Sequence, residues 1–578
     1  MEGVKRIPYG VSNFIEVVEQ NQYYVDKTMY LPMLEEQPSS IFFIRPRRFG
    51  KSIFLSMMRA YYDISQKESF QSHFGNLWIG QHPTPLQGTY QILFLDFSRA
   101  SGGSGSLEES FNRYCGMVMD SFGQVYERYY FPGFEESMKS QPDFVSKLNY
   151  LNQQSTIYKP HLYLIIDEYD NFTNIVLNEQ GNEIYHALTH ASGFYREIFK
   201  KFKGMFERIF MTGVSPVTLD DLTSGFNIGW NISTEYQFNM MLGFSETDVR
   251  EMLQYYKDAG KLKGDVEAMI KEMKPWYDNY CFAKQSLKRD PKMFNCDMVF
   301  YYLRHYMNLD HAPDQMIDPN TRTDYEKMKK LIGLDRLDGD RKGVLRRITE
   351  EGEIMTNLIT TFPAAQITDP EIFPSLLFYY GMLTITATRG ERVILGIPNN
   401  NVRKQYYEFM LEEYQSKEYI SLNNLKDLYD DMAFDGQWHK ALEFIAHSYK
   451  ENSSVRSAIE GERNIQGFFT AYLSISSYYL TAPEVELNHG YCDLFLMPDL
   501  QRYEEIAHSY ILELKYLPEK DFNARHEAQW QDAVKQIRGY AAGPRVQQLI
   551  QGTQLHCIIM QFRGCELARM EEITMLDN

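Results

Sequence analysis

Gly50, Lys51 and Ser52 stand where an apolar run meets a helix-like stretch, a spacing suited to binding phosphate. The glycine lets the backbone approach a phosphate, the lysine reaches the terminal phosphates of ATP, and the serine hydroxyl ligates Mg²⁺. The preceding loop, Arg45-Pro46-Arg47-Arg48-Phe49, has Arg45 where the usual phosphate-binding loop has its first glycine. A residue before proline favours extended backbone, so Arg45 is compatible with the loop. We predict that residues 45–52 bind ATP.

A carboxylate pair, Asp167-Glu168, ends the apolar run 162–166. Such a strand brings one carboxylate to magnesium and a second to the attacking water of a nucleotide hydrolase. We predict Asp167 as a ligand of nucleotide-bound Mg²⁺, together with Ser52, and Glu168 as a catalytic residue. Thr212 ends another apolar run, and with Ser215 it is placed to sense a γ-phosphate. The alternative is an ordinary set of core strands with acidic ends.

A second set of residues with potential catalytic roles lies near the C-terminal end of the sequence, namely Asp493, Glu513 and Lys515. Two carboxylates on adjacent strands hold Mg²⁺, or Mn²⁺, between water and a scissile phosphate. A lysine two residues along the strand lies on the same face and orients the water or offsets phosphate charge. Glu462, on the preceding helix, is predicted to complete the metal shell, and Gln536 to contact the nucleic-acid backbone. A solvent-facing strand is the alternative.

The order of apolar runs indicates the elements that position these residues. In the first 220 residues, short apolar runs alternate with helical stretches, which predicts a parallel sheet with helices on both faces. Near the C-terminal end, a helix from about Glu462 precedes two strands around an Asn-His-Gly turn. The strand "HSYILELKYL" and the helix "EAQWQDAVKQIRGYA" follow. The predicted fold class is therefore a multidomain α/β protein.

Five motifs of the N-terminal part resemble the AAA-ATPase-like family of bacterial proteins. They are "YGVSNFIEVVEQNQYYVDKTMYLPMLEE", "RPRRFGKS", "LIIDEYD", "TGVSP" and "GFSETDV", in that order. The resemblance implies that the loop without its first glycine is the usual form in this family. It also draws attention to Asp26 and Lys27, which lie either near the nucleotide or in a surface salt bridge.

The C-terminal residues resemble the PD-(D/E)xK nucleases, with Cys492 where those enzymes have proline. AAA-ATPase-like proteins often carry such a domain at the C-terminus, so the resemblance implies an ATPase followed by a nuclease-like domain. We predict an AAA-like P-loop ATPase over 1–243, a helical lid over 244–370 with Ser245 as N-cap, a winged-helix-like and helical linker module over 371–454, and the nuclease-like domain over 455–578. The helix and hairpin of the third region suit a mere packing module equally well.

Composition limits the classes of partner. The 578 residues carry a net charge of −18, so contact with nucleic acid would require local basic patches, such as those from Lys200, Lys327 and Arg341. The alternative for each patch is an ordinary solvent-exposed helix face with no binding role. Six isolated cysteines and the lack of a signal-like or membrane-spanning apolar stretch favour a soluble protein in a reducing, cytoplasmic setting.

The sequence therefore predicts an ATP-binding, ATP-hydrolysing protein whose nucleotide state gates a Mg²⁺-dependent nuclease-like domain acting on DNA or RNA. The alternative is a non-cleaving ATPase switch that keeps an inactive nuclease fold as a docking module for protein or nucleic acid. The acidic net charge favours the switch, and the intact Asp493, Glu513 and Lys515 set favours the nuclease. Assembly into a homo-oligomer is left open.

Overall fold

Two compact units make up the chain. The computed structural model describes residues 3–100, 107–170, 194–216, 229–313, 316–318, 341–362, 369–415, 422–453, 462–487, 490–500 and 502–574. Unit 1 comprises Met1–Arg341 and Ile354–Asn399, and unit 2 comprises Lys342–Glu353 and Asn400–Asn578. None of the six cysteines forms a disulfide. Within the described ranges, every helix is too short or too polar to cross a lipid bilayer.

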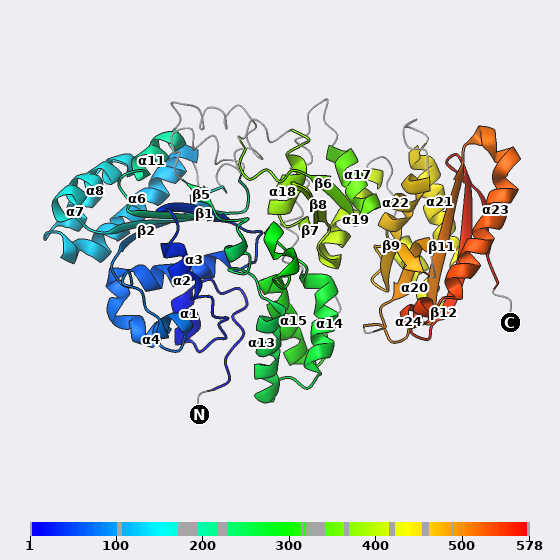
Figure 1. Ribbon diagram of the computed structural model, residues 1–578, viewed down its shortest axis with the longest axis horizontal. Helices are drawn as coiled ribbons and strands as arrows, with labels where there is room; N and C mark the ends of the chain where they lie inside the picture. Colours follow the sequence, from blue (N-terminus) through cyan, green and yellow to red (C-terminus); the bar gives the residue numbers. More distant parts are fainter. Residues whose placement is uncertain are drawn as a thin grey trace. The chain divides into compact units, whose positions relative to one another are not determined.

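A five-stranded sheet forms the centre of unit 1, with the strand order β2-β3-β4-β1-β5 (Figure 1). All of its neighbouring strands run parallel, as predicted. Because β1, β4 and β3 are neighbouring parallel strands, their carboxyl ends lie at the same edge of the sheet. The loop after β1 and the carboxylates at the end of β3 are therefore close together. The strands are β1 (Ser40–Ile44), β2 (Gln91–Asp96), β3 (Leu162–Asp167), β4 (Arg208–Gly213) and β5 (Trp230–Asn231).

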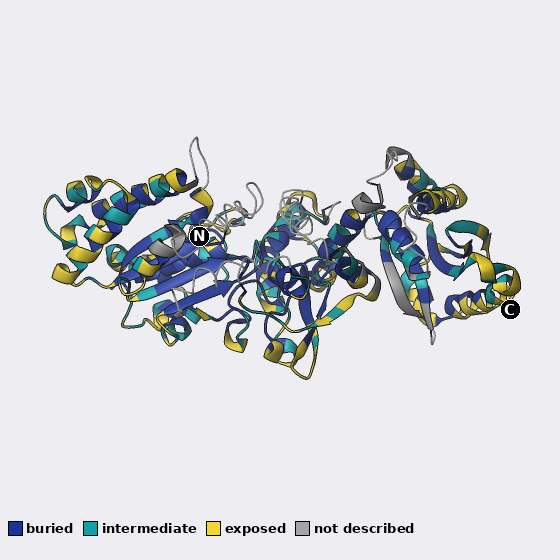
Figure 2. Ribbon diagram, turned by 90° about the horizontal axis from the view of Figure 1, so that it is seen from above, coloured by how far each residue is buried: buried dark blue, intermediate teal, exposed yellow. Residues whose placement is uncertain are grey.

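Helices flank this sheet on both sides, with α6, α8 and α11 on one side and α1, α2 and α3 on the other (Figure 1). The strands β1 to β4 are short, mostly buried runs, and Figure 2 shows buried strand residues in dark blue. The helices are α1 (Phe14–Glu19), α2 (Tyr30–Glu35), α3 (Lys51–Tyr62), α4 (Phe70–Phe74), α5 (Trp78–Gln81), α6 (Leu107–Tyr126), α7 (Phe134–Lys139), α8 (Phe144–Tyr158) and α11 (Phe194–Phe202).

The helices α13 (Glu246–Asp258), α14 (Val266–Tyr277) and α15 (Cys296–Leu309) share a separate hydrophobic core. The predicted start of α13 is confirmed, because Ser245 and Asp248 form a reciprocal capping box. Farther along the chain, α18 (Phe373–Tyr379) precedes the antiparallel strands β7 (Thr384–Arg389) and β8 (Arg392–Gly396). The predicted helix and hairpin are thus present; β6 (Glu353–Thr356), which was not predicted, adds a third strand. A winged-helix identity stays a prediction.

Unit 2 contains a mixed five-stranded sheet of order β13-β12-β11-β10-β9. Only the pair β11 and β12 runs parallel. Its strands are β9 (Tyr479–Leu487), β10 (Gly490–Pro498), β11 (His508–Leu517), β12 (Gln554–Arg563) and β13 (Glu566–Glu572). Its helices are α17 (Arg341–Glu351), α19 (Asn400–Gln415), α20 (Leu422–Asp435), α21 (His439–Ser453), α22 (Glu462–Leu473), α23 (Glu519–Ala541) and α24 (Pro544–Ile550).

The contact boundary between the units differs from the boundary that we predicted at 454/455. Buried residues of α20 and α21, among them Tyr429 and Leu442, share one hydrophobic core with α22 and with strands β10 to β12. Separating these helices from the sheet would expose that apolar surface to water, at a cost of about 25 cal/mol per Å². The sequence-based prediction therefore did not reveal which helices complete the C-terminal core.

Candidate functional sites

The phosphate-binding loop runs from the end of β1 to the start of α3. Gly50 caps α3 in the left-handed backbone region, at φ 88°, where a side chain would be strained. Arg48 also has a positive φ of 67° and lies 3.8 Å from the buried carboxylate of Asp318. The loop thus contains a glycine that its backbone conformation requires, and a basic residue, Arg48, whose side chain lies near a carboxylate outside the loop.

The side chain of Arg45 does not face the loop. It is 1% exposed, and its guanidinium lies between the rings of Phe43 and Phe282, at 4.1 and 4.2 Å from their centroids. It donates hydrogen bonds to the carbonyls of Ile44, Ser233 and Phe238. Burial lowers the pKa of Arg45 to about 9, which still leaves it protonated at neutral pH. Arg45 therefore belongs to the nucleotide site through its backbone, while its side chain fixes the loop to the core.

Replacing Arg45 by methionine is expected to destabilise unit 1. The methionine leaves three buried carbonyls without their donor, each costing about 1–3 kcal/mol. A loss of about 3 kcal/mol lowers the unfolding midpoint of a unit of this size by roughly 3–5 °C, because the entropy of unfolding grows with chain length. Calorimetric unfolding checks this, with Arg128→Gln as control, because Arg128 is exposed and lies over an aromatic ring, that of Tyr129. Equal midpoints for Arg45→Met and wild type contradict the anchoring role.

Lys51 is the buried cation of the loop. Its Nζ donates to the carbonyls of Arg45 and Pro46, both at 2.9 Å, and burial lowers its pKa. Next to it, the Ser52 hydroxyl donates to Oδ2 of Asp167 at 2.7 Å. Burial raises the pKa of Asp167 to about 6, although the bond from Ser52 and the charge of Lys51 oppose this. A hydroxyl and a buried carboxylate at a helix N-terminus suit Mg²⁺ that is bound together with phosphates.

The remaining predicted residues of the nucleotide site are held in different ways. Glu168 has a positive φ of 48° and lines the cavity beside the loop. The Thr212 hydroxyl is buried and donates to the carbonyl of Phe43 at 2.7 Å, so sensing a phosphate would require this bond to open. The amide of Ser215 donates to buried Asp170, which the sequence analysis did not single out.

A cavity of about 380 Å³ adjoins the loop. Lys27 lines this cavity and forms a largely buried ion pair of 2.8 Å with Asp248 in the capping box of α13. Its proximity to the nucleotide stays a prediction. The cavity wall also includes aromatic residues that the sequence analysis did not single out. They lie far from the loop in the sequence, and only the fold brings them next to it. They are Tyr23, Tyr24, Phe244 and Phe300.

In unit 2, the predicted residues Glu462, Asp493, Glu513 and Lys515 do come together. Nζ of Lys515 lies 2.8 Å from Glu513 and 3.6 Å from both Asp493 and Glu462. Antiparallel pairing of β10 with β11 places Asp493 next to Glu513. Oδ2 of Asp493 also accepts the backbone N–H of Leu514 at 2.7 Å. The lysine thus lies among the carboxylates as their internal counter-ion.

The charges of this cluster affect one another. Burial raises the pKa of both Asp493 and Glu513, and repulsion by Glu462 adds to the shift of both, while Lys515 opposes it. Although burial alone would lower it, the three surrounding carboxylates raise the pKa of Lys515. A buried carboxylate pair that resists ionisation is one that gains from a divalent cation.

The donor set can accept a metal ion through two carboxylates. Oε2 of Glu513 is buried and has no hydrogen-bond partner among the described residues, so it offers an uncommitted donor. Within the same residues, no three His, Cys, Asp or Glu side chains are close enough to form a ready-made metal site. Mg²⁺ keeps several waters and often needs only one or two carboxylates, so this set fits it. Gln536 is exposed on α23, and its contact with nucleic acid stays a prediction.

The predicted basic patches are only partly available to a partner. Arg341 is fully buried, with its guanidinium 4.8 Å from the ring of Phe373, so it supports the core instead. The patch at Lys200 ends α11, and Lys203 there is exposed. The patch at Lys327 lies outside the described residues.

Comparison with known families agrees with this division of the chain. Residues 8–223 match the sequence model of a family described as predicted AAA-ATPase, and residues 460–572 match that of the PD-(D/E)XK nuclease superfamily. The chain therefore carries an AAA-ATPase-like domain, which supports ATP binding, and a PD-(D/E)XK nuclease superfamily domain. The resemblances that the sequence motifs indicated are confirmed.

Individual relatives add less. An uncharacterized protein in the vnfD 5′ region of Azotobacter chroococcum mcd 1 is 26% identical over 293 residues, which are 49% of this chain and 50% of that protein. The match thus spans half of that relative. The Aeropyrum pernix ORC2 protein in ADPNP–ADP complexes is 10% identical with a TM-score of 0.31, over 67% of this chain and 92% of that one. The ORC1 protein of the same organism, in complex with DNA, is 9% identical with a TM-score of 0.26, over 66% and 90%.

Proposed function

We propose that the chain hydrolyses ATP in unit 1 and uses the nucleotide state to control a metal-dependent nuclease site in unit 2. The observation that carries the ATPase part is the contact of Ser52 with Asp167, beside buried Lys51 and the cavity of about 380 Å³. Lys51 would bind the terminal phosphates, and Ser52 with Asp167 would hold Mg²⁺. Glu168 would orient the attacking water and accept its proton.

In unit 2, Asp493 and Glu513 would hold Mg²⁺ or Mn²⁺, which supplies charge to stabilise the phosphate and lowers the pKa of a water. Lys515 would then leave the space between the carboxylates and contact either this water or the scissile phosphate. Support comes from the convergence of these side chains, with Lys515 within 3.6 Å of each carboxylate. The substrate class is DNA or RNA.

A second function is favoured by the same contacts. Lys515 already offsets part of the charge of the carboxylates, which is the role expected of it in a fold retained only for docking. The burial of Arg341 and the net charge of −18 also reduce the surface available to nucleic acid. In that case the chain is an ATP-driven switch that binds a protein or nucleic-acid partner without cleaving it.

ATP with Mg²⁺ is expected to change the protease sensitivity of residues 245–455. Lys27 and Asp248 connect the cavity wall to α13, so a bound nucleotide has different contacts when α13 moves. A ligand shifts a conformational equilibrium only through such differential contacts. Trypsin digestion with and without a non-hydrolysable ATP analogue measures this, with Lys51→Ala as the control that should not respond. Identical digestion of wild type in both conditions would mean that the units act independently.

A further inference from the structure

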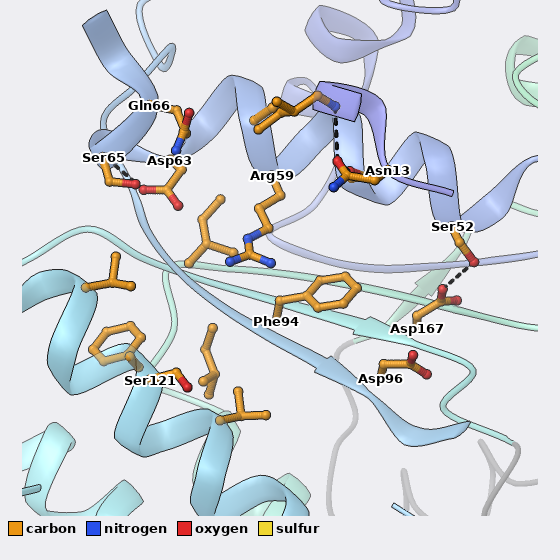
Figure 3. A pocket seen from close by; sticks show the side chains of 18 of the residues that line it. Asn13, Ser52, Arg59, Asp63, Ser65, Gln66, Phe94, Asp96, Ser121 and Asp167 are labelled. Atoms are coloured by element: carbon orange, nitrogen blue, oxygen red, sulfur yellow. Dashed lines mark hydrogen bonds between the residues drawn. The ribbon is translucent and has the colours of Figure 1, made fainter. Parts of the chain in front are cut away.

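A second cavity of unit 1, of about 750 Å³, lies between α3, β2 and α6 (Figure 3). It is larger than the nucleotide cavity, and the two share Ser12 and Ser52. The cavity therefore begins at the contact of Ser52 with Asp167 and continues along α3 as far as Asp63. The cavity is an open cleft, since Arg59 and Val125 in its lining are exposed to solvent. A partly apolar cleft next to a reaction centre is a common place for a small ligand.

The walls of this cavity are built around the edge of the sheet. β2 is the edge strand, and tyrosines of α6 hold its backbone at two points. The Tyr126 hydroxyl accepts the N–H of Ile92, and the Tyr114 hydroxyl accepts the N–H of Asp96, both at 2.9 Å. Between these two contacts the cavity is lined by apolar groups from β2 and α6, namely Ile92, Phe94, Val118, Phe122 and Val125.

Two arginines line this cavity, Arg59 and Arg99, and Arg99 is paired with Asp96. The guanidinium of Arg59 extends from α3 to 5.7 Å from the centroid of Phe94 (Figure 3). No carboxylate of the described residues forms an ion pair with Arg59. A guanidinium over an aromatic face is a ready partner for an anionic group, because it offers several donors in one plane.

The carboxylates of the cavity do not supply that anion, because each is engaged elsewhere. Asp63 accepts the N–H of Ser65 at 2.8 Å and the Tyr126 hydroxyl at 2.9 Å. Asp96 accepts the N–H and hydroxyl of Ser98 and pairs with Arg99 at 3.2 Å. Asp167 accepts the hydroxyl of Ser52. Arg59 is therefore the charged group with which an anionic ligand would pair.

We propose that this cavity is a second ligand site, distinct from the nucleotide site, for a small anionic molecule with a ring system. Its anionic group binds Arg59, and its rings lie over Phe94 against Val118 and Phe122. The Tyr114 hydroxyl, which accepts a backbone N–H, retains its own proton to donate. Because the cavities meet at Ser52, the ligand lies against the site of the terminal phosphate, so the two ligands change each other's affinity by the same factor.

Two fluorescent probes test the site on the full chain. 8-Anilinonaphthalene-1-sulfonate carries rings and a sulfonate, and N-phenyl-1-naphthylamine carries the same rings without charge. Arg59→Gln is expected to weaken binding of the sulfonate at least about tenfold, the usual size of a lost bond to a charged group, and to leave the neutral probe unchanged. Val118→Trp fills the cavity and is expected to weaken both.

Matched variants control for charge and bulk outside the cavity. Arg128→Gln removes a guanidinium that lies over the ring of Tyr129, and Met117→Trp introduces the same indole side chain one residue away, where the native side chain is 64% exposed. Both should titrate like wild type. If Val118→Trp has no effect, the cavity is not the binding site; if only Arg59→Gln has none, the requirement for an anion is wrong. Neither probe titration depends on ATP turnover or nucleic-acid cleavage, so a failure of this proposal can be told apart from a failure of the function proposed above.

Discussion

The Lys51→Ala variant is expected to lose ATP hydrolysis by at least about a hundredfold and to bind Mg–ATP much more weakly. Lys51 is the buried cation of the phosphate-binding loop, and its Nζ donates to the carbonyls of Arg45 and Pro46. Exchanging neutral carbonyl acceptors for phosphate oxygens strengthens these hydrogen bonds, because both partners are then charged. Alanine has no donor, so this gain disappears.

Phosphate release and isothermal titration calorimetry with Mg–ATP measure the two effects. Lys203→Ala is the matched control, because Lys203 is exposed and lies in a predicted basic patch. Lys51→Ala also leaves two loop carbonyls without their donor, so a loss of fold has to be separated from a loss of chemistry. Lys51→Arg keeps a cation and donors, and its unfolding midpoint should stay near that of wild type. Undiminished turnover of Lys51→Ala, in homogeneous protein, excludes the proposed phosphate site.

Glu168→Gln separates binding from hydrolysis at the same site. The amide keeps the size of the carboxylate and removes its ability to accept a proton from water. Glu168 lines the nucleotide cavity next to Lys51, so the variant should still bind ATP and retain it for longer. Filter binding of radiolabelled ATP after gel filtration detects this trapped state. Release of ADP at the wild-type rate would assign the proton transfer to another residue.

The sequence predicted the elements whose signals are local. β1, β3 and β11 are short runs with apolar or alternating residues, and each is found within a residue or two of its expected position. Gly50 and the capping box at Ser245 are also local signals, because each is fixed by the conformation of a few neighbouring residues. The positions of the candidate site residues at the ends of these strands and helices could therefore be predicted as well.

Contacts between distant parts of the chain could not be predicted in this way. Arg45 is in the loop by sequence, but its side chain is placed by carbonyls of Ser233 and Phe238, almost 200 residues away. The ion pair of Lys27 with Asp248 has the same character. Membership of a core has no local signal either, as α20 and α21 show, since they complete the core of unit 2. Such features depend on tertiary packing, which propensity and periodicity do not encode.

Mn²⁺ is expected to stabilise unit 2 of wild type, and Asp493→Ala should remove both this effect and any nuclease activity. Asp493 and Glu513 are buried neighbours, and ligation by a cation offsets their repulsion. At a hundredfold excess over the dissociation constant, binding adds about 2.7 kcal/mol to stability. Burial raises the pKa of both carboxylates, and a metal binds their deprotonated forms. Affinity should therefore increase from about pH 6 to about pH 8.

Lys515→Ala is expected to abolish cleavage while metal binding remains. Lys515 lies 2.8 Å from Glu513 and 3.6 Å from Asp493, so in the absence of metal it competes for the same carboxylates. Its removal ends this competition but also raises the pKa of both carboxylates further, so Mn²⁺ binding should persist and its pH dependence should move to higher pH than in wild type. The lost activity would follow from the missing cation at the water or the phosphate.

Calorimetry with Mn²⁺, together with cleavage of single- and double-stranded DNA and RNA, tests both variants. Asp532→Ala and Lys535→Ala are the matched controls, because each removes an exposed charge from α23. Retained metal binding without cleavage in Lys515→Ala, and loss of both in Asp493→Ala, is the result that a nuclease gives. If wild type binds no Mn²⁺ at millimolar concentration and cuts none of these substrates, Lys515 is a permanent counter-ion. Unit 2 then acts as a docking module for the ATP-driven switch.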